Sequence, residues 1–234
     1  MTLDPPLRRI TALAAAGMLA GLAAIFLWVP TEAFQGPVQR IFYVHVPAAW
    51  IAYLAFAVTL IGSIAYLRTS SQRWDLLAHA SAEVGVVFSA LNLVTGVIWA
   101  RPIWGTWWTW DARLTSMFVL FVIYVGYLAF RSLATDPTRG ARIAAVIGIV
   151  GFVDVPIVHF SVTWWRTLHP ARTVINPPGR PQLPLEMLAT LLFMLAVFTL
   201  LYALLLTLRV RLARLGDEVR ELEAGLGTDI GVAG

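Results

Sequence analysis

The sequence predicts an all-α, polytopic membrane protein with six transmembrane helices, and three observations support this fold class. First, hydrophobic residues make up 59% of the 234 residues, charged residues only 13%, and the mean hydropathy is +0.76. A soluble domain would carry about 25% charged residues. Second, six apolar stretches approach or exceed the roughly 20 residues that cross a bilayer. Third, helix breakers or charges separate these stretches, and because backbone amides in lipid must bond internally, each stretch is expected to be a helix.

The expected spans follow directly from the apolar stretches. They cover about residues 10–29, 41–67, 79–100, 114–131, 142–161 and 185–208. The gaps contain Pro30, Gln72 with Arg73, Pro102 with Gly105, Asp136 with Pro137, and the stretch from Asn176 to Pro184. No repeat or separate soluble domain is evident, so residues 1–234 are expected to form a single membrane domain. The first span lacks a clear cleavage site after it and is interpreted as a retained helix, and the polar tail from Arg209 as a solvated end.

Orientation is predicted from the arginines, because positive charge favours cytoplasmic loops. All 17 basic residues are arginine. Eleven fall at the termini and in the loops near residues 68–75 and 131–142, and six fall on the other side. Both termini are therefore expected to be cytoplasmic, and the six outer arginines call for another explanation.

Several classes of function are excluded by composition. The chain has no cysteine, which excludes disulfides, zinc–thiolate sites, iron–sulfur clusters and thiol nucleophiles. Without a C-x-x-C-H motif it cannot hold haem through thioether bonds. The arginines are dispersed among apolar spans, so a nucleic-acid interface is not predicted. No nucleotide-binding loop is present, so any ATP would be handled by a partner.

Tryptophan is concentrated at the predicted outer face. Nine of the ten tryptophans fall there: Trp28, Trp50, Trp99, Trp104, Trp107, Trp108, Trp110, Trp164 and Trp165. An interfacial anchor is one interpretation, since tryptophan favours membrane interfaces. A helical 104–111 segment would place four side chains on one stripe: Trp104, Trp107, Trp108 and Asp111. Such a stripe would form a platform for a flat ligand.

Three of the four histidines, His45, His159 and His169, also fall near the outer face. Haem would use histidine, tryptophan and arginine together: its iron takes an imidazole ligand, its macrocycle is flat and apolar, and its propionates suit the guanidinium fork. The outer arginines that could pair with the propionates are Arg101, Arg113, Arg172 and Arg180. A quinone or lipid would not need two histidines, and a zinc site would not need the tryptophans.

Three segments carry a resemblance to a known family. WGTWWTWDARLT, from Trp104 to Thr115, resembles the tryptophan-rich WWD motif of membrane proteins that handle haem in cytochrome c biogenesis. HVPAAW, from His45, and VPIVHFSVTWWRTLHP, from Val155, are similar to the CcmC type in particular. Length, number of spans and order of elements agree over nearly the whole chain.

The resemblance implies a haem-binding and delivery protein of the bacterial inner membrane rather than an enzyme. Proteins of the CcmC type bind haem at the periplasmic face and present it to a CcmE-type haem chaperone. Their partners are an ABC-transporter-like pair of the CcmA and CcmB types and a small CcmD-type subunit. The implied cargo is a b-type haem, bound non-covalently and in transit. The sequence does not decide whether the chain assists covalent attachment to the chaperone.

The resemblance also implies roles for individual residues. His45 and His169 are the implied axial ligands of the iron. The implied platform and its supporting residues all lie in the loop 101–113: Trp104, Trp107, Trp108 and Trp110, with Gly105, Asp111 and Arg113. Arg101, Arg113 and Arg172 are the candidates for pairing with the propionates. His169 belongs to the second outer loop, 162–184, whereas His159 matches no ligand position and is expected to cap the outer end of the fifth helix.

Three alternatives remain open at this stage. An electron-transfer protein of the cytochrome b type would hold haem between histidines in the middle of facing helices. A haem transporter subunit of an ABC-type complex would need a polar path across the membrane, which Gly85, Asn92, Thr95 and Gly96 leave open. A purely structural subunit would leave the tryptophan-rich segment unexplained.

Carboxylates in or beside the spans are Glu83, Asp154 and Glu186. A carboxylate in a membrane is costly and is a functional candidate by default. We favour helix–helix hydrogen bonds, for example from Glu83 to Ser89 or Asn92, over proton coupling. Glu186 is expected to be interfacial, at a helix N-terminus where its charge suits the helix dipole.

Overall fold

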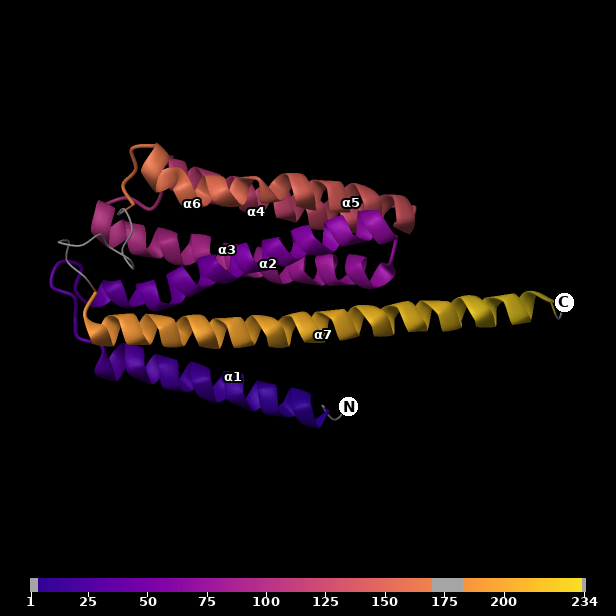
Figure 1. Cartoon of the computed structure of the whole chain (residues 1–234), viewed down its shortest axis with the longest axis horizontal. Helices are drawn as coiled ribbons and strands as arrows, with labels where there is room; N and C mark the ends of the chain where they lie inside the picture. The colour runs from indigo at the N-terminus through magenta and orange to yellow at the C-terminus, as the bar shows by residue number, and fades with distance from the viewer. Residues whose placement is uncertain (1–3, 170–182, 233–234) are drawn as a thin grey trace.

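The computed structural model describes residues 4–169 and 183–232, which are almost entirely helical (Figure 1). Its α-helices are α1 (Pro5–Ala23), α2 (Phe42–Thr69), α3 (Gln72–Trp104), α4 (Ala112–Leu133), α5 (Pro137–Phe152), α6 (Asp154–Trp164) and α7 (Leu185–Val232). A π-helical turn at Ala24–Trp28 continues α1, and a 3-10 turn at Pro37–Ile41 precedes α2. Six helical segments are long and apolar enough to cross a membrane, and the described residues contain no strand. The predicted all-α protein with six transmembrane helices is confirmed.

The path of the chain brings its two ends to the same end of the bundle (Figure 1). The segments joining α1 to α2 and α3 to α4 lie at the opposite end, which we call the distal end; the end nearer the termini is the proximal end. One span, Pro137–Trp164, consists of two helices, α5 and α6, joined at Val153. At 48 residues and 1.5 Å per residue, α7 is about 72 Å long, so it continues well beyond a bilayer.

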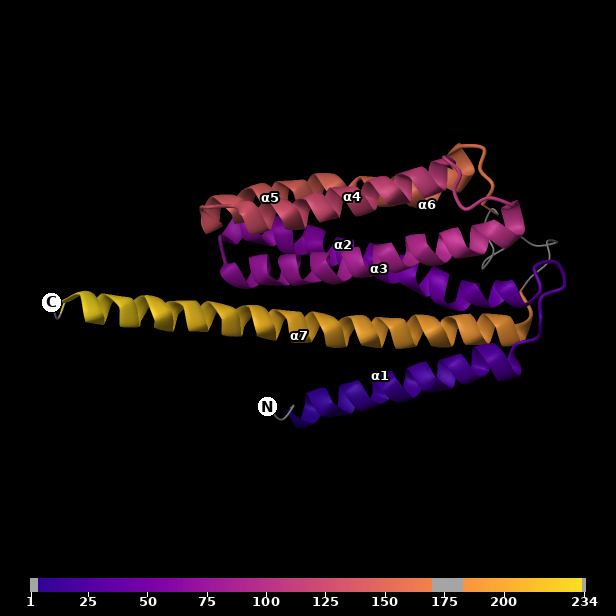
Figure 2. The ribbon, with the colours of Figure 1, turned by 180° about the vertical axis from the view of Figure 1, so that it is seen from behind.

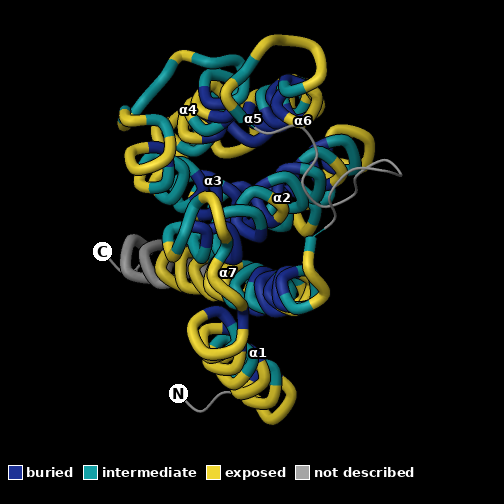
Figure 3. Tube along the Cα trace, turned by 90° about the vertical axis from the view of Figure 1, so that its left-hand side faces the viewer, coloured by how far each residue is buried: buried dark blue, intermediate teal, exposed yellow. Residues whose placement is uncertain are grey.

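The helices are arranged in layers around α2 and α3 (Figures 2 and 3). α4, α5 and α6 cover one side of this central hairpin, and α7 covers the other side. α1 packs on the outer face of α7, where the chain is mostly exposed (Figure 3). The buried core therefore follows α2 and α3, which also carry the residues of both polar regions described below.

Short polar side chains join the central helices. Ser81 on α3 donates to the carbonyl of Ala55 on α2 at 2.7 Å and lies 2.8 Å from the Tyr202 hydroxyl on α7. Thr59 on α2 donates to the Ala55 carbonyl in its own helix and lies 3.2 Å from the Ala78 carbonyl on α3. Hydrogen bonds of this kind, with small residues at the interface, are a common way to join helices that share an apolar surrounding.

Gly85 is a point of close approach between α3 and α2. A methyl group at this position would lie 2.6 Å and 2.9 Å from two ring carbons of Phe56. That ring cannot move away easily, because it is fully buried and stacks on Tyr124 with ring centroids 3.7 Å apart.

We therefore expect Gly85→Ala to lower the free energy of unfolding by about 1–3 kcal/mol, the usual cost of overpacking a core. Gly126→Ala is the matched control, because a methyl group there would meet nothing within 4 Å. Thermal unfolding of the purified chain in detergent measures the difference. Equal stability of the two variants would contradict the tight contact.

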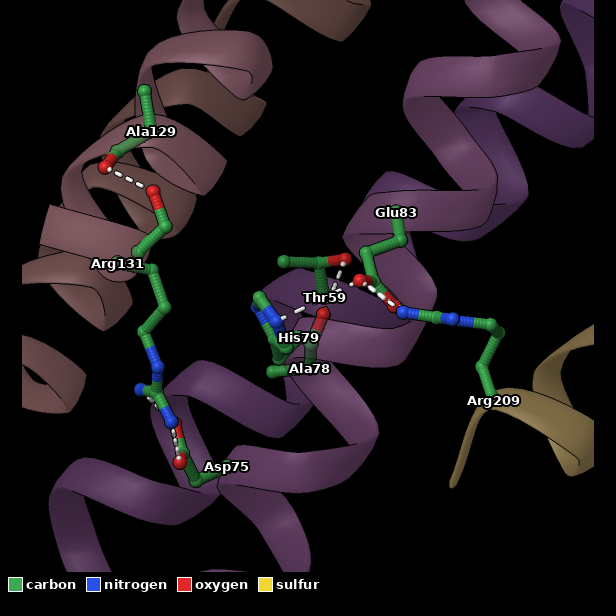
Figure 4. A network of polar contacts seen from close by, with 9 residues as sticks. Thr59, Asp75, Ala78, His79, Glu83, Ala129, Arg131 and Arg209 are labelled. Atoms are coloured by element: carbon green, nitrogen blue, oxygen red, sulfur yellow. Dashed lines mark hydrogen bonds and ion pairs between the residues drawn. The ribbon is translucent and has the colours of Figure 1, made fainter. Parts of the chain in front are cut away.

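A network of ion pairs lies near the proximal end of α3 (Figure 4). Arg131 on α4 binds both carboxylate oxygens of Asp75, with Nη1 2.7 Å from Oδ1. Arg209 on α7 does the same for Glu83, with Nε 2.7 Å from Oε2. His79, one turn before Glu83, has Nε2 3.8 Å from the Glu83 carboxylate. These pairs tie α3 to α4 on one side and to α7 on the other, beside a polar cavity of about 820 Å³.

The network corrects one prediction. Glu83 does not bond to Ser89 or Asn92; its partner is the guanidinium of Arg209, and Asn92 contacts His45 instead. A charged partner was missed because it lies on the last helix, far away in the sequence. For Asp154 the structure provides no hydrogen-bond partner at Oδ2 within the described residues.

Candidate functional site

The tryptophan-rich segment is a turn between two helices. α3 runs to Trp104 and ends at Gly105, which adopts a left-handed φ of 76° and donates its N–H to the Arg101 carbonyl at 3.1 Å. α4 begins after Asp111, whose side chain accepts from the Leu114 N–H at 2.9 Å. The helix over 104–111 that was considered above does not form: a C-terminal glycine and an N-cap aspartate separate two helices.

The considered stripe of Trp104, Trp107, Trp108 and Asp111 consequently does not form. Trp104 and Trp108 are half-buried, whereas Trp107 and Trp110 are 57% and 74% exposed. Trp108 packs edge-on against Trp110, and its buried indole N–H has no partner within the described residues. The segment presents two inward and two outward indoles at the distal end.

Asp111 connects the tryptophan-rich segment to the segment after α6. One carboxylate oxygen takes the Leu114 N–H; the other accepts from the Thr167 hydroxyl at 2.8 Å and lies 3.3 Å from Nδ1 of His169. Burial alone would raise the pKa of Asp111, but the hydrogen bonds from His169, Leu114 and Thr167 outweigh burial and hold the pKa well below its ordinary value. Asp111 is therefore a fixed anion.

His169 contacts residues of the tryptophan-rich segment and of its own segment after α6. Its backbone N–H donates to the Thr167 hydroxyl oxygen at 3.2 Å, and its ring meets the Trp104 indole edge-on with centroids 5.0 Å apart. Together with the Asp111 contact, these interactions fix the ring although His169 lies outside any helix.

His45, in the first turn of α2, is held by α3. Its Nδ1 lies 3.0 Å from the Thr95 hydroxyl oxygen, and the Asn92 amide donates to its backbone carbonyl at 3.0 Å. The Trp99 indole meets the ring edge-on at 5.7 Å. The ring also rests on Gly96, where a methyl group would come within 3.1 Å of Cε1. The absence of a side chain at Gly96 leaves the space that the imidazole occupies.

The two histidines line the same cavity, which has a volume of about 90 Å³. Its walls include the predicted residues His45, His169, Trp108 and Arg113, together with Tyr53, Val46, Ala49, Asn92, Leu93, Gly96, Val97, Leu114, Met117 and Val158. Parts of α2, α3, α4 and α6 and the segment after α6 thus converge on one point at the distal end. The cavity contains a guanidinium and two imidazoles against an aromatic and apolar wall.

Other predicted residues lie outside this cavity. Arg101 is exposed and bonds to the Gly105 carbonyl, with its guanidinium 6.0 Å from the Trp107 ring centroid. Arg172, and the rest of the outer loop between residues 170 and 182, fall outside the described residues. His159 is exposed on α6, five residues before the end of that helix at Trp164. Its expected role as a helix cap is therefore wrong.

Sequence reasoning missed several residues of the site. Tyr53, Met117 and Thr167 were not singled out. Asn92 and Thr95 were considered for a path across the membrane, and Asn92 also as a partner of Glu83, but neither as a partner of His45. A signal was present for the last two. Asn92 and Thr95 are three residues apart in an apolar helix, so both had to lie on one face, and a shared polar partner was to be expected.

Comparison with known proteins identifies the family. Residues 3–224 match the protein-family model described as heme exporter protein C. The chain belongs to this family. The heme exporter protein C of Bradyrhizobium diazoefficiens is 40% identical over 194 residues, which cover 83% of this chain and 73% of the relative. The heme exporter protein C of Escherichia coli K12 is 38% identical over 186 residues, or 80% and 74% of the two chains.

A plant relative extends the comparison. A Marchantia polymorpha protein named as a putative cytochrome c biosynthesis ccmC-like mitochondrial protein is 37% identical over 149 residues, 62% of this chain and 63% of the relative. The resemblance to CcmC proteins is thereby confirmed. As a heme exporter protein C family member with six apolar helices, the chain is a multi-pass membrane protein of a family associated with cytochrome c biogenesis.

Proposed function

We propose that this chain binds haem at its distal end, between His45 and His169, and presents it to a CcmE-type chaperone for cytochrome c maturation. One observation carries the proposal: the two histidines come from distant parts of the sequence yet line one cavity. Two imidazole nitrogens that reach one cavity could serve as the two axial ligands of a six-coordinate haem iron. The family name of the relatives, heme exporter protein C, is consistent with this cargo.

The surroundings of the two histidines also suit haem. Trp108 lines the cavity and Trp104 lies against His169, so that flat apolar surfaces border the proposed ligands. Arg113 brings a positive charge to the same cavity for a propionate. Among the proposed propionate partners it is therefore favoured over Arg101, which is turned to the Gly105 carbonyl.

The cavity is too small to enclose a whole haem. Its 90 Å³ is well below the roughly 300–1,000 Å³ of typical ligand pockets. Haem would therefore lie partly outside it, where the exposed Trp107 and Trp110 offer apolar surface. A cargo with an exposed edge suits delivery to another protein, and no catalytic step is required of this chain.

In this proposal the distal end faces the periplasm and both termini are cytoplasmic, in the bacterial inner membrane. The periplasmic partner is the CcmE-type chaperone. CcmA-, CcmB- and CcmD-type subunits would complete the complex, with ATP bound by the CcmA type. The haem is a b-type, non-covalent cargo.

The alternatives are less well supported. An intramembrane haem of the cytochrome b type would need both histidines within facing helices, whereas His169 follows the last residue of α6. A transporter would need a path between the two cavities. Along α3 the proximal cavity reaches Glu83 and the distal one reaches Asn92, and between them Phe56 packs tightly against Gly85. The closed core favours loading at the distal face.

Haem titration of the purified chain tests the proposal. The wild-type chain is expected to bind one haem with the absorption spectrum of a low-spin, six-coordinate iron. The His45→Ala, His169→Ala double variant is expected to lose that spectrum and to bind haem at least a hundredfold more weakly, because both iron ligands are gone. His159→Ala is the matched control, since this exposed histidine lies outside the cavity. A wild-type spectrum in the double variant would refute the assignment of both ligands.

A further inference from the structure

In both proposed iron ligands, Nδ1 is the ring nitrogen that contacts an oxygen of a neighbouring side chain. Nδ1 of His45 lies 3.0 Å from the Thr95 hydroxyl oxygen. That hydroxyl directs its own hydrogen to backbone carbonyls of α3, at 2.7 Å and 3.0 Å, so its oxygen accepts from the imidazole. Nδ1 of His169 lies 3.3 Å from a carboxylate oxygen of Asp111, which can only accept when ionised.

These contacts determine the tautomer of both rings. A neutral imidazole that donates from Nδ1 carries its free lone pair on Nε2. The Asn92 amide does not select a nitrogen of His45, because it lies at nearly equal distances, 3.3 Å and 3.4 Å, from both. Metal-binding histidines almost always donate their second N–H to an oxygen acceptor, which orients the ring and raises its basicity. Both histidines therefore present Nε2 as the iron-binding atom.

The two acceptors differ in charge. Thr95 offers a neutral hydroxyl, whereas Asp111 offers a carboxylate that is itself fixed by the Leu114 N–H and the Thr167 hydroxyl. The Asp111 contact is longer, 3.3 Å against 3.0 Å for Thr95. Its acceptor is ionised, however, and because a hydrogen bond to an ionised acceptor is roughly twice as strong as one to a neutral acceptor, we expect it to shift more electron density onto the imidazole.

We propose, resting on the haem function above, that Asp111 and Thr95 are positioning residues that make the two iron ligands unequal. Asp111 makes His169 the stronger donor, which stabilises ferric iron and retains the haem when the other bond is lost. Thr95 only orients His45, so the bond between His45 and the iron is the first to exchange. Because the two iron–histidine bonds differ in strength, they break in a fixed order when the haem is released, first at His45 and then at His169.

The midpoint potential of the bound haem tests the role of Asp111. Asp111→Asn removes the charge but keeps a good N-cap for α4. We expect it to weaken ferric binding about tenfold relative to ferrous binding, which equals an upward shift of about 59 mV for one electron. Thr95→Val is expected to shift the potential less. Asp136→Asn is the matched control, because Asp136 caps α5 at the proximal end.

Haem release provides a second test that does not depend on Asp111 variants folding. Transfer of haem to excess apomyoglobin is expected to be faster from His169→Ala than from His45→Ala, because the stronger ligand is lost. Slower or equal transfer from His169→Ala would overturn the order of release. A potential in Asp111→Asn equal to that of wild type would overturn the role of the carboxylate. Either result with an intact low-spin wild-type spectrum leaves the proposed function standing, whereas no such spectrum in wild type rejects the function itself.

Discussion

Asp75→Asn is expected to lower the free energy of unfolding by about 3–5 kcal/mol, the usual cost of removing one partner from a buried ion pair. Asp75 is 7% exposed, and both of its oxygens bind the guanidinium of Arg131 on the neighbouring helix. The substitution would leave the charge of Arg131 without its partner at a largely buried position between α3 and α4. Unfolding in detergent, followed by heat or by added denaturing detergent, gives the difference.

Two further variants separate the charge from the packing. Asp75→Leu combined with Arg131→Met replaces the pair by apolar side chains, and such replacements are often close to neutral, so most of the stability should return. Arg220→Ala breaks an exposed pair with Asp217 on α7 and should cost less than 1 kcal/mol. A double variant as unstable as the single one would show that the pair is not what joins α3 to α4 here.

The fold was predictable because each span is a local property of the sequence. Six stretches are long, apolar and separated by breakers, and a helix is the only way for such a stretch to satisfy its backbone in lipid. The break at Val153 between α5 and α6 was not predicted, although the sequence carries a signal for it: Pro156 has no N–H to donate to the carbonyl of Phe152, four residues earlier. α7 continues past residue 208, where the predicted span ends, because its polar continuation is also helical.

The site was predictable only in part, because its residues come together from several helices. Resemblance in the motif gave His45, His169, Trp108 and Arg113, which line one cavity. It did not predict which of these residues contact one another. Asp111 and His169 are 58 positions apart in the sequence, and no local pattern predicts a contact over that separation. The helical stripe considered for this segment does not form, because a helical period does not continue across Gly105, where α3 ends.

Arg113→Ala is expected to weaken haem binding about 10- to 100-fold. Arg113 lines the cavity with both histidines, and no salt bridge joins it to a carboxylate in residues 4–169 or 183–220. A half-buried guanidinium without an anionic partner is costly, so a ligand that brings a carboxylate should be favoured. A hydrogen bond to a charged group contributes about 1.5–3 kcal/mol, and each 1.4 kcal/mol is a factor of ten in affinity.

Haem dimethyl ester provides the test that identifies which part of the ligand Arg113 recognises. The ester keeps the iron and the macrocycle but lacks both propionate charges, so Arg113→Ala should weaken haem binding while leaving ester binding nearly unchanged. Arg101→Ala is the matched control, because Arg101 is exposed and bonds to the Gly105 carbonyl. An equal loss of affinity for haem and its ester in Arg113→Ala would show that Arg113 shapes the cavity and does not pair with a propionate. A loss confined to Arg101→Ala would instead mean that the propionates point out of the cavity, towards the exposed tryptophans at the distal end.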